Sequence, residues 1–159
     1  MSGIHKSSVI SSDGKVFKTL PLNLAAEIAE FDRLRIWLQE FAQKLELPEE
    51  TTSRLLIAAD EVFTNIASYA YPGTSGEVEV SAEQDGAMLR LTFTDSGKPF
   101  DPLRADDPNT KGPLSERKIG GLGIFVVKKM MDKVEYRREN DRNILTLTKR
   151  ISPEVPPCS

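Results

Sequence analysis

The spacing of apolar residues predicts a first amphipathic helix that ends at about Leu45. Apolar side chains recur there at steps of three and four residues, which is the period of one helical face. The stripe consists of Ile28, Phe31, Leu34, Leu38, Phe41 and Leu45. Pro21 and Asn23 offer a start for this helix. Residues 7–20, which contain the turn sequence Ser-Asp-Gly, are expected to form a strand or a hairpin ahead of it.

A second amphipathic helix is predicted between Pro48 and the turn sequence Pro72-Gly73. Pro48 suits the start of a helix, and Glu49 and Glu50 suit the positive end of the helix dipole. The apolar stripe of this helix consists of Leu55, Ala59, Val62, Ile66 and Ala70. Both helices are therefore expected to bury one side against a common core.

Alternation of apolar and polar residues predicts two strands after the second helix, at about residues 77–82 and 89–94. The turn sequence Gln84-Asp85-Gly86 lies between them and favours a hairpin. The side chains of one face alternate strictly with those of the other, so one face of this hairpin is expected to be buried.

The end of the chain predicts a third helix at about residues 121–132 and two strands at about 133–139 and 143–151. Asn140-Asp141-Arg142 is expected to join these strands. Short turns between consecutive strands favour antiparallel pairing. The last two strands are therefore expected to form a second hairpin.

Residues 96–120 are rich in glycine, proline and charges. A stretch of that length without regular structure inside a domain is usually functional or disordered. The order of elements predicts an α+β fold, a two-layer sandwich with an antiparallel or mixed, mostly antiparallel sheet and helices on one face. We expect a single domain over residues 1–151 and a flexible tail over residues 152–159.

Composition narrows the possible chemistry. With 39% hydrophobic and 28% charged residues, the chain can build both a core and a solvated surface. A net charge of −3 argues against direct nucleic-acid binding. No apolar run is long enough to cross a bilayer, and the first residues lack the apolar middle of a signal peptide, so a cytoplasmic protein is expected. One histidine and one cysteine argue against a zinc site or a Ser-His-Asp triad, which leaves carboxylates, amides, backbone groups and a bound ion.

Glu61 and Asn65 share one side of the second helix because they are four residues apart. They lie beside the apolar stripe of that helix. A carboxylate there can act as a general base, and an amide oxygen can bind a hard metal ion. An exposed polar pair on a solvated helix is the alternative.

Asp95 continues the inward side of the second predicted strand, because it has the same parity as Leu89, Leu91 and Phe93. A buried carboxylate needs hydrogen-bond donors, and the amino group of an adenine would serve. The alternative is a turn cap, since Asp-Ser-Gly is a good turn sequence. Gly97 suits that turn and would also allow a ligand base to approach the backbone.

Gly120-Gly121-Leu122-Gly123 leads from the long loop into the third helix. Glycines before a helix allow backbone N–H groups to bind a phosphate, although the same glycines can form a simple hinge. The sequence lacks the Gly-Lys-Ser/Thr of a Walker A loop and the spacing of a Rossmann fingerprint.

Other prominent residues are interpreted as structural. Lys128-Lys129 and Arg137-Arg138 are expected to be solvated, and Met130-Met131 and Trp37 to pack in the core. Charged residues of the long loop can contact phosphates or simply lie at the surface.

Three stretches in this order resemble the motifs of anti-sigma regulatory factors, which are bacterial serine/threonine kinases. Ala-Asp-Glu-Val-Phe-Thr-Asn-Ile-Ala-Ser-Tyr-Ala-Tyr at 59–71 resembles their N box. Asp-Ser-Gly-Lys-Pro-Phe-Asp-Pro at 95–102 is similar to their first glycine box, and residues 120–136 are similar to their second glycine box and the following helix. The likeness runs from about Leu20 to Ile151 and implies the histidine-kinase-like ATPase fold.

The resemblance implies ATP and Mg²⁺ as cofactors. Asn65 would bind Mg²⁺, Glu61 would be the general base, and Asp95 would accept the adenine amino group. Residues 102–120 would form an ATP lid. The nucleotide-binding residues that the resemblance implies are Asn65, Asp95, Gly97, Phe100, Gly120, Gly121, Leu122, Gly123 and Ile124.

Two positions depart from the family pattern. Tyr69-Ala70-Tyr71 stands where the family often has His-Ala-Tyr, and Arg142-Asn143 stands where it commonly has Gly-Thr before the final strand. The second departure affects part of the adenine contact, while Asp95 is still expected to anchor it.

By this resemblance the chain is expected to be a serine kinase in a partner-switching pathway of transcription regulation. Its expected partners are a STAS-type anti-sigma-factor antagonist, which it would phosphorylate, and a sigma factor or another regulator, which it would sequester; a homodimer is also possible within the family. One alternative is a nucleotide-gated binding module without phosphoryl transfer. Another is a structural interaction domain with a degenerate pocket.

Overall fold

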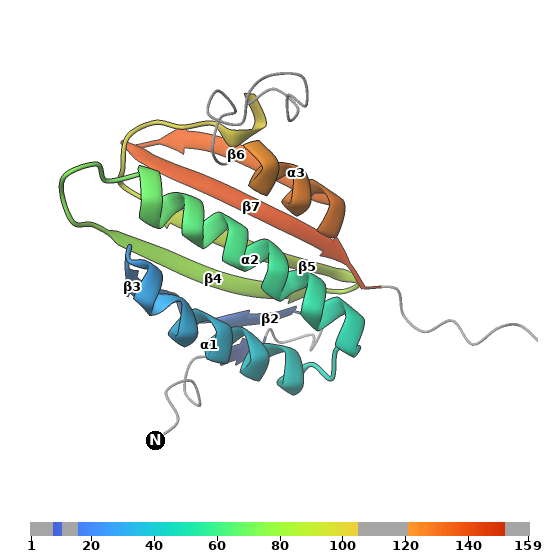
Figure 1. Cartoon of the computed structure of the whole chain (residues 1–159). Helices are drawn as coiled ribbons and strands as arrows, with labels where there is room; N and C mark the ends of the chain where they lie inside the picture. Colours follow the sequence, from blue (N-terminus) through green and yellow to red (C-terminus); the bar gives the residue numbers. More distant parts are fainter. Residues whose placement is uncertain (1–7, 11–15, 105–120, 152–159) are drawn as a thin grey trace, which may run out of the picture.

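In the described part of the chain, an antiparallel sheet of seven strands forms one layer and three α-helices form the other (Figure 1). The computed structural model describes residues 8–10, 16–104 and 121–151. The strands are β1 (Ser8–Ile10), β2 (Val16–Thr19), β3 (Leu22–Ala25), β4 (Glu77–Asp85), β5 (Met88–Asp95), β6 (Lys133–Glu139) and β7 (Arg142–Arg150). The helices are α1 (Phe31–Lys44), α2 (Glu49–Tyr69) and α3 (Gly121–Met130), with 3-10 turns η1 (Ile28–Glu30) and η2 (Pro102–Arg104).

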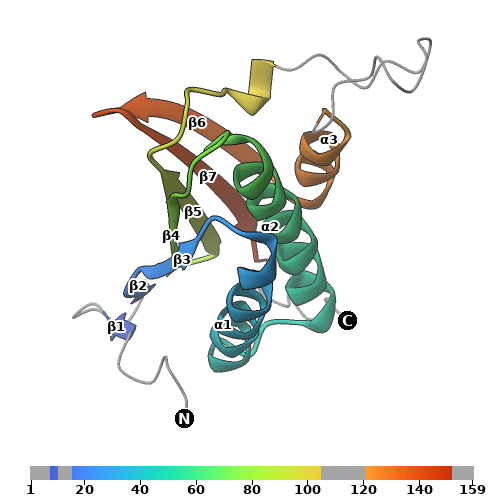
Figure 2. The same ribbon diagram turned by 60° about the vertical axis from the view of Figure 1, so that its left-hand side comes forward.

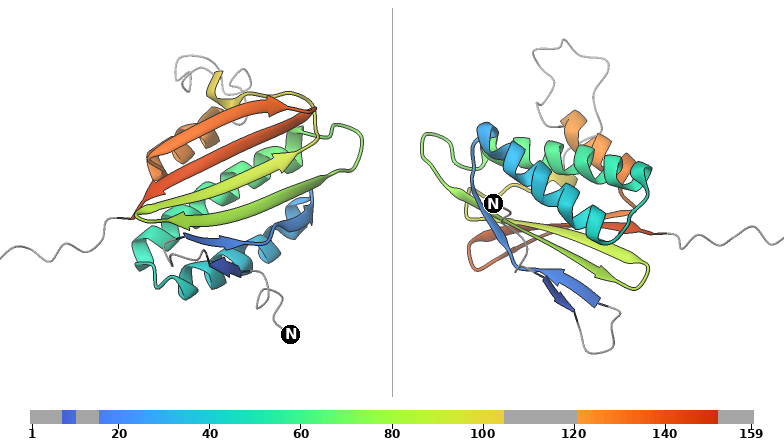
Figure 3. Two further views of the ribbon diagram at one scale, coloured as in Figure 1. Left: turned by 180° about the vertical axis from the view of Figure 1, so that it is seen from behind. Right: turned by 90° about the horizontal axis from the view of Figure 1, so that it is seen from below.

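The strand order is β1-β2-β4-β5-β7-β6, and β3 also pairs with β4. Each pair within the described ranges is antiparallel. All three α-helices lie on the same face of this sheet, and no helix of the described residues lies on the opposite face (Figures 2 and 3). The predicted α+β sandwich with helices on one face is confirmed.

The start of the first helix was predicted wrongly. Residues Leu22–Ala25, expected to lie in its first turns, form β3 and pair with residues 77–80 of β4. Leu24 is buried in the core from this strand position. The α-helix begins only at Phe31, after the 3-10 turn η1. Tertiary pairing with the free edge of β4 outweighs the local signal of Pro21 and Asn23, which is common for weak helix starts.

The core lies between the helices and the inward side of β4, β5 and β7. These strands alternate buried and half-buried side chains along most of their length. The helices contribute most of the predicted stripes, except that Ile28 lies in η1 and is 55% exposed. Trp37 is buried as expected, with 3% of its surface exposed. The largest fully buried side chains are Phe63, Phe93, Leu24, Leu34, Leu38, Leu89, Leu147, Val78, Val80 and Val127. None of the described helices is long and apolar enough to cross a membrane.

Sheet register aligns three polar side chains in one row at the end of this core. The β6–β7 hairpin turns at Asn140 and Asp141, whose φ angles of 53° and 61° are typical of a tight two-residue turn. This turn pairs Arg138 with Asn143, and Asn143 in turn pairs with Asp95 on β5. The adjacent rows carry apolar residues, so a polar row of Asp95, Asn143 and Arg138 borders the core.

Tyr71 connects the end of α2 to the strands. Its hydroxyl donates to the carbonyl of Glu77 at 2.7 Å and accepts from the N–H of Ser96 at 2.8 Å. Its ring also occupies the space that a side chain at Gly76 would need. Burial raises the pKa of Tyr71 above its usual value of 10.0, and the nearby Asp95 contributes to the increase.

Tyr71→Phe is expected to lower the free energy of unfolding by about 1–2 kcal/mol, because two backbone groups lose their partner. Because this pKa is raised, the contribution of the Tyr71 hydroxyl to the free energy of unfolding is fully present below pH 10. It is lost as the pH rises through the folded-state pKa. The Phe variant should lose that part of the pH dependence. Urea denaturation between pH 7 and 11 measures both effects, with Tyr69→Phe as the control. An unchanged alkaline slope in Tyr71→Phe would contradict the assignment.

Candidate functional site

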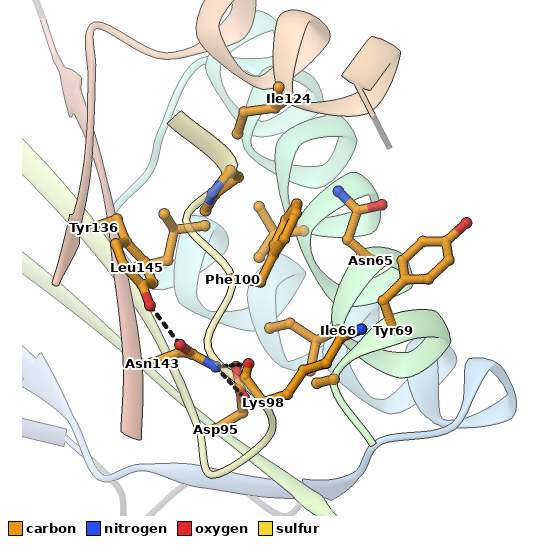
Figure 4. A pocket seen from close by; sticks show the side chains of 13 residues that line it. Asn65, Ile66, Tyr69, Asp95, Lys98, Phe100, Ile124, Tyr136, Asn143 and Leu145 are labelled. Carbon is orange, nitrogen blue, oxygen red and sulfur yellow. Dashed lines mark hydrogen bonds between the residues drawn. The ribbon is translucent and has the colours of Figure 1, made fainter. Parts of the chain in front are cut away.

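A pocket opens between the C-terminal half of α2, the N-terminal part of α3 and the ends of β5 and β7 (Figure 4). Most of its wall is apolar, and its polar groups are few. The lining residues are Val62, Asn65, Ile66, Tyr69, Ala70, Asp95, Lys98, Phe100, Pro102, Ile124, Tyr136, Asn143 and Leu145.

Asp95 and Asn143 form the buried polar end of this pocket. Asp95 is 5% exposed and Asn143 is 6% exposed. The side-chain amide of Asn143 donates to Asp95 Oδ1 at 2.9 Å and to the carbonyl of Lys98, also at 2.9 Å. The N–H of Gly97 donates to the same Asp95 oxygen at 2.8 Å. Asp95 therefore has both predicted properties: it is buried at the strand end, and it caps the turn that follows.

The turn after β5 packs directly on the end of α2. The N–H of Lys98 donates to the carbonyl of Ala70 at 2.9 Å. A Cβ atom on Gly97 would lie 2.4 Å from that same oxygen, a distance that real side chains do not adopt. The close contact with α2 therefore requires glycine at position 97, which the sequence alone did not reveal.

Glu61 and Asn65 lie on the side of α2 that faces the first turn of α3. A Cβ atom at Gly123 would be 2.7 Å from Glu61 Oε2 and 3.5 Å from Asn65 Nδ2. Glu61 is half-buried, whereas its neighbour Asp60 is exposed. A carboxylate, an amide and the N-terminal turn of a helix thus meet at one edge of the pocket.

The structure brings together several residues predicted to bind nucleotide. Asn65, Asp95, Phe100 and Ile124 line one pocket, and Gly97 supports its floor. Gly123 joins Glu61 to this group. Gly121 and Leu122 form the start of α3. Gly120 and most of the expected lid, residues 105–120, lie outside the described residues.

Sequence reasoning did not name Tyr136 or Asn143 as pocket residues, although it linked the Arg142-Asn143 departure to part of the adenine contact. Arg138 is exposed as expected, and its guanidinium also donates to the carbonyl of Gly97 at 2.9 Å and to Asn143 Oδ1 at 3.1 Å. Asn143 shares the parity of Leu145 and Leu147, which is the one sequence signal that places it on the inward side. Arg137 also matches the expectation, because it is exposed and pairs with Glu139.

The donor set fits a nucleotide better than a protein-held metal centre. No group of three or more His, Cys, Asp or Glu side chains that could hold a metal ion occurs in the described part of the chain. A Mg²⁺ ion here would need ligands from outside the protein, such as phosphate oxygens, in addition to Asn65. The largely apolar wall with a buried carboxylate at one end suits a flat base that carries an amino group.

The sequence of the chain is similar to those of known proteins. Residues 24–149 match the family model described as histidine kinase-like ATPase domain. The chain is 31% identical over 137 residues to the serine/threonine-protein kinase BtrW of Bordetella bronchiseptica, covering 86% of this chain and 95% of the relative. It is 30% identical over 139 residues to the serine-protein kinase RsbW of Listeria innocua, covering 84% of this chain and 87% of the relative.

Solved structures agree on the fold. A structure of the RsbU and RsbW domains of a Mycobacterium tuberculosis protein superposes with a TM-score of 0.58 at 18% identity. It covers 84% of this chain, which spans only 33% of that longer chain. A blue-light activated histidine kinase of Erythrobacter litoralis superposes with a TM-score of 0.51 at 25% identity, covering 67% of this chain and 32% of that one.

Proposed function

The chain belongs to the histidine kinase-like ATPase domain family, and we propose that it transfers the γ-phosphoryl group of ATP to a serine or threonine of a partner protein. Its relatives over most of its length are serine-protein kinases. One observation carries the proposal for this chain: a buried carboxylate, a helix amide and a second carboxylate border one cleft beside a glycine-containing helix start.

Each of these groups has a role in the proposed site. Asp95 would accept a hydrogen bond from the adenine amino group. The apolar side chains of Ile66 and Ile124, which line the same pocket, would contact the adenine ring. Asn65 would bind Mg²⁺ through its amide oxygen, and the first turn of α3 would hold phosphate oxygens. The ion would supply positive charge that offsets the charge of the phosphates. Phe100, at the pocket mouth, would cover the nucleotide.

Glu61 would act on the second substrate. Its carboxylate would accept the proton of the attacking hydroxyl while that oxygen forms a bond to the γ-phosphorus and the bond to the ADP oxygen breaks. The position of Glu61 beside Asn65 supports this role, because the general base must be close to the phosphate that reacts. Most of the rate would come from positioning and charge stabilisation.

We further propose the partners of this kinase. Its phosphate acceptor would be a small STAS-type anti-sigma-factor antagonist, and its second partner a sigma factor or another regulator that it holds inactive. Both reactions would take place in the cytoplasm, and the protein could act as a homodimer. The kinship with proteins named RsbW and BtrW supports a partner-switching role.

The test combines labelled ATP with the chain and a STAS-domain protein from the same genome. Transfer of label to the STAS protein, dependent on Mg²⁺, is the expected result. Thermal melting with Mg-ATP measures binding separately, because a ligand at 100 times its Kd raises the free energy of unfolding by about 2.7 kcal/mol. Binding without transfer to any STAS protein would favour a nucleotide-gated binding module. No thermal shift at millimolar ATP would contradict the proposed function.

Gly123→Ala is expected to slow transfer at least tenfold without destabilising the fold. The new methyl group would meet Glu61 Oε2 at 2.7 Å, and the carboxylate is the far end of a flexible side chain that can move away. Alanine in place of a helical glycine adds up to about 1 kcal/mol of stability. Initial rates and urea denaturation measure the two effects.

A double variant identifies the cause of that loss. In a Glu61→Gln background, Gly123→Ala should reduce the rate by less than about twofold, since contacting residues are not additive. A full tenfold reduction in that background would mean that Gly123 acts on the phosphates and not through Glu61.

A further inference from the structure

Asn143 uses all four of its hydrogen-bonding positions inside the protein. Its amide nitrogen donates to Asp95 Oδ1 and to the carbonyl of Lys98, both at 2.9 Å. Its amide oxygen accepts from the Tyr136 hydroxyl at 2.6 Å and from the Arg138 guanidinium at 3.1 Å. An Asn side chain has two donor hydrogens and two acceptor lone pairs, so none is left for a ligand.

These partners determine which way the amide points. In a flipped amide, the oxygen would face the carboxylate of Asp95 and the carbonyl of Lys98, which are both acceptors. The amino group would face the guanidinium of Arg138, which can only donate. The chemistry of the neighbours therefore defines one orientation of Asn143, and this orientation presents a donor to Asp95.

The effect on Asp95 is to divide the roles of its two oxygens. Oδ1 accepts from the Asn143 amide and from the N–H of Gly97. Both hydrogen bonds that the side-chain carboxylate of Asp95 accepts from other described residues end on this atom. The second oxygen, Oδ2, is therefore available as an acceptor for a bound ligand, and rotation of the carboxylate would break both contacts.

We propose that Asn143 is a positioning residue for base recognition, which holds Asp95 so that one carboxylate oxygen meets the amino group of the purine. Tyr136 and Arg138 support it from β6 by fixing its amide oxygen. The proposal rests on the proposed function, because it requires that a nucleotide base binds in this pocket. The role that we assign to Asn143 is to make the pocket selective for a 6-amino purine, in addition to the contact that Asp95 itself makes.

A pair of nucleotides separates positioning from general support of the fold. ATP carries the 6-amino group, and purine riboside triphosphate is the same molecule without it. Asn143→Leu is expected to weaken ATP binding about tenfold and binding of the analogue less than twofold, because only ATP uses the Asp95 contact. Asn143→Thr keeps one donor and should recover part of the loss. Calorimetric Kd values for both nucleotides, with Asn23→Leu as the exposed control, give the result.

Asn143→Asp tests the same contact through its pH dependence. Two carboxylates would then face each other at about the present 2.9 Å, with Tyr136 and Arg138 on the far side and the carbonyl of Lys98 beside them. A proton shared between two such close carboxylates supplies the missing donor, and once it is lost as the pH rises the two negative charges repel. ATP affinity relative to wild type should therefore fall as the pH rises from 6 to 8.5. Tyr71, whose pKa is raised above 10.0 partly by Asp95, stays protonated over this range.

Asn23→Asp makes the same chemical change at an exposed position of β3, and its affinity ratio should stay flat with pH. Equal losses for ATP and the analogue in Asn143→Leu, or a flat ratio in Asn143→Asp, would overturn the positioning role while leaving the proposed function intact. Wild-type protein that binds neither nucleotide would instead contradict the proposed function itself. Circular dichroism melts identify any variant that fails to fold, in which case Asn143→Thr provides the comparison.

Discussion

Replacing Glu61 with glutamine is expected to slow phosphoryl transfer by a factor of about 10² to 10⁴ while ATP affinity changes by less than about threefold. Glutamine has nearly the same shape as glutamate but cannot accept the proton of the attacking hydroxyl. Glu61 does not line the pocket itself and lies beside Asn65, on the side of Gly123. Single-turnover rates measure the loss, and calorimetry measures ATP affinity. Glu61→Ala should show the same separation.

Asp60→Asn is the matched control for this experiment. It removes the same charge from the adjacent residue, whose carboxylate is exposed and accepts a hydrogen bond from the Thr64 hydroxyl. Transfer should stay within about twofold of wild type, because Asp60 points away from the pocket side of α2. A normal rate in Glu61→Gln would refute the role of Glu61 as the base, and an equal loss in both variants would indicate a general electrostatic effect.

Local pattern was sufficient to predict most of the sandwich. The helix after Pro48 and the two hairpins have one buried side each, so their period in the sequence directly reflects their burial in the structure. The segment around Leu22 has no such period over a useful length. This segment forms β3 because β2 pairs only with the end of β4, which leaves an edge of β4 free for β3. Such long-range pairing cannot be predicted from the local sequence.

The candidate site could be predicted where its residues are close in sequence. Glu61 and Asn65 share a helix side by spacing alone, and the parity of Asp95 follows from its own strand. Asn143 and Arg138 reach Asp95 only through the register of two hairpins and the turn at Asn140. A one-residue slip in either register would turn these side chains to the open face, so their contact cannot be read from the sequence pattern.

Asp95→Asn is expected to weaken ATP binding about 100-fold and to change which base the pocket prefers. The oxygen of the new amide can still accept from Gly97 and Asn143, which leaves its amino group in place of Oδ2. A donor then faces the adenine amino group, which is also a donor, and a site with an unpaired buried polar group rejects its ligand strongly. A purine with a 6-oxo group, as in inosine triphosphate, offers an acceptor at that position and should gain affinity relative to ATP.

The ratio of the two Kd values is the decisive measurement, because a damaged pocket would weaken both nucleotides alike. Asp85→Asn, at the exposed far end of β4, removes an equal charge and should leave the ratio unchanged. If Asp95→Asn keeps the wild-type preference for ATP, the base does not contact this carboxylate, and the purine must bind elsewhere in the cleft. A reversed preference would mean that Oδ2 of Asp95 selects the base. This is the expected result, because Oδ1 already accepts hydrogen bonds from Gly97 and Asn143.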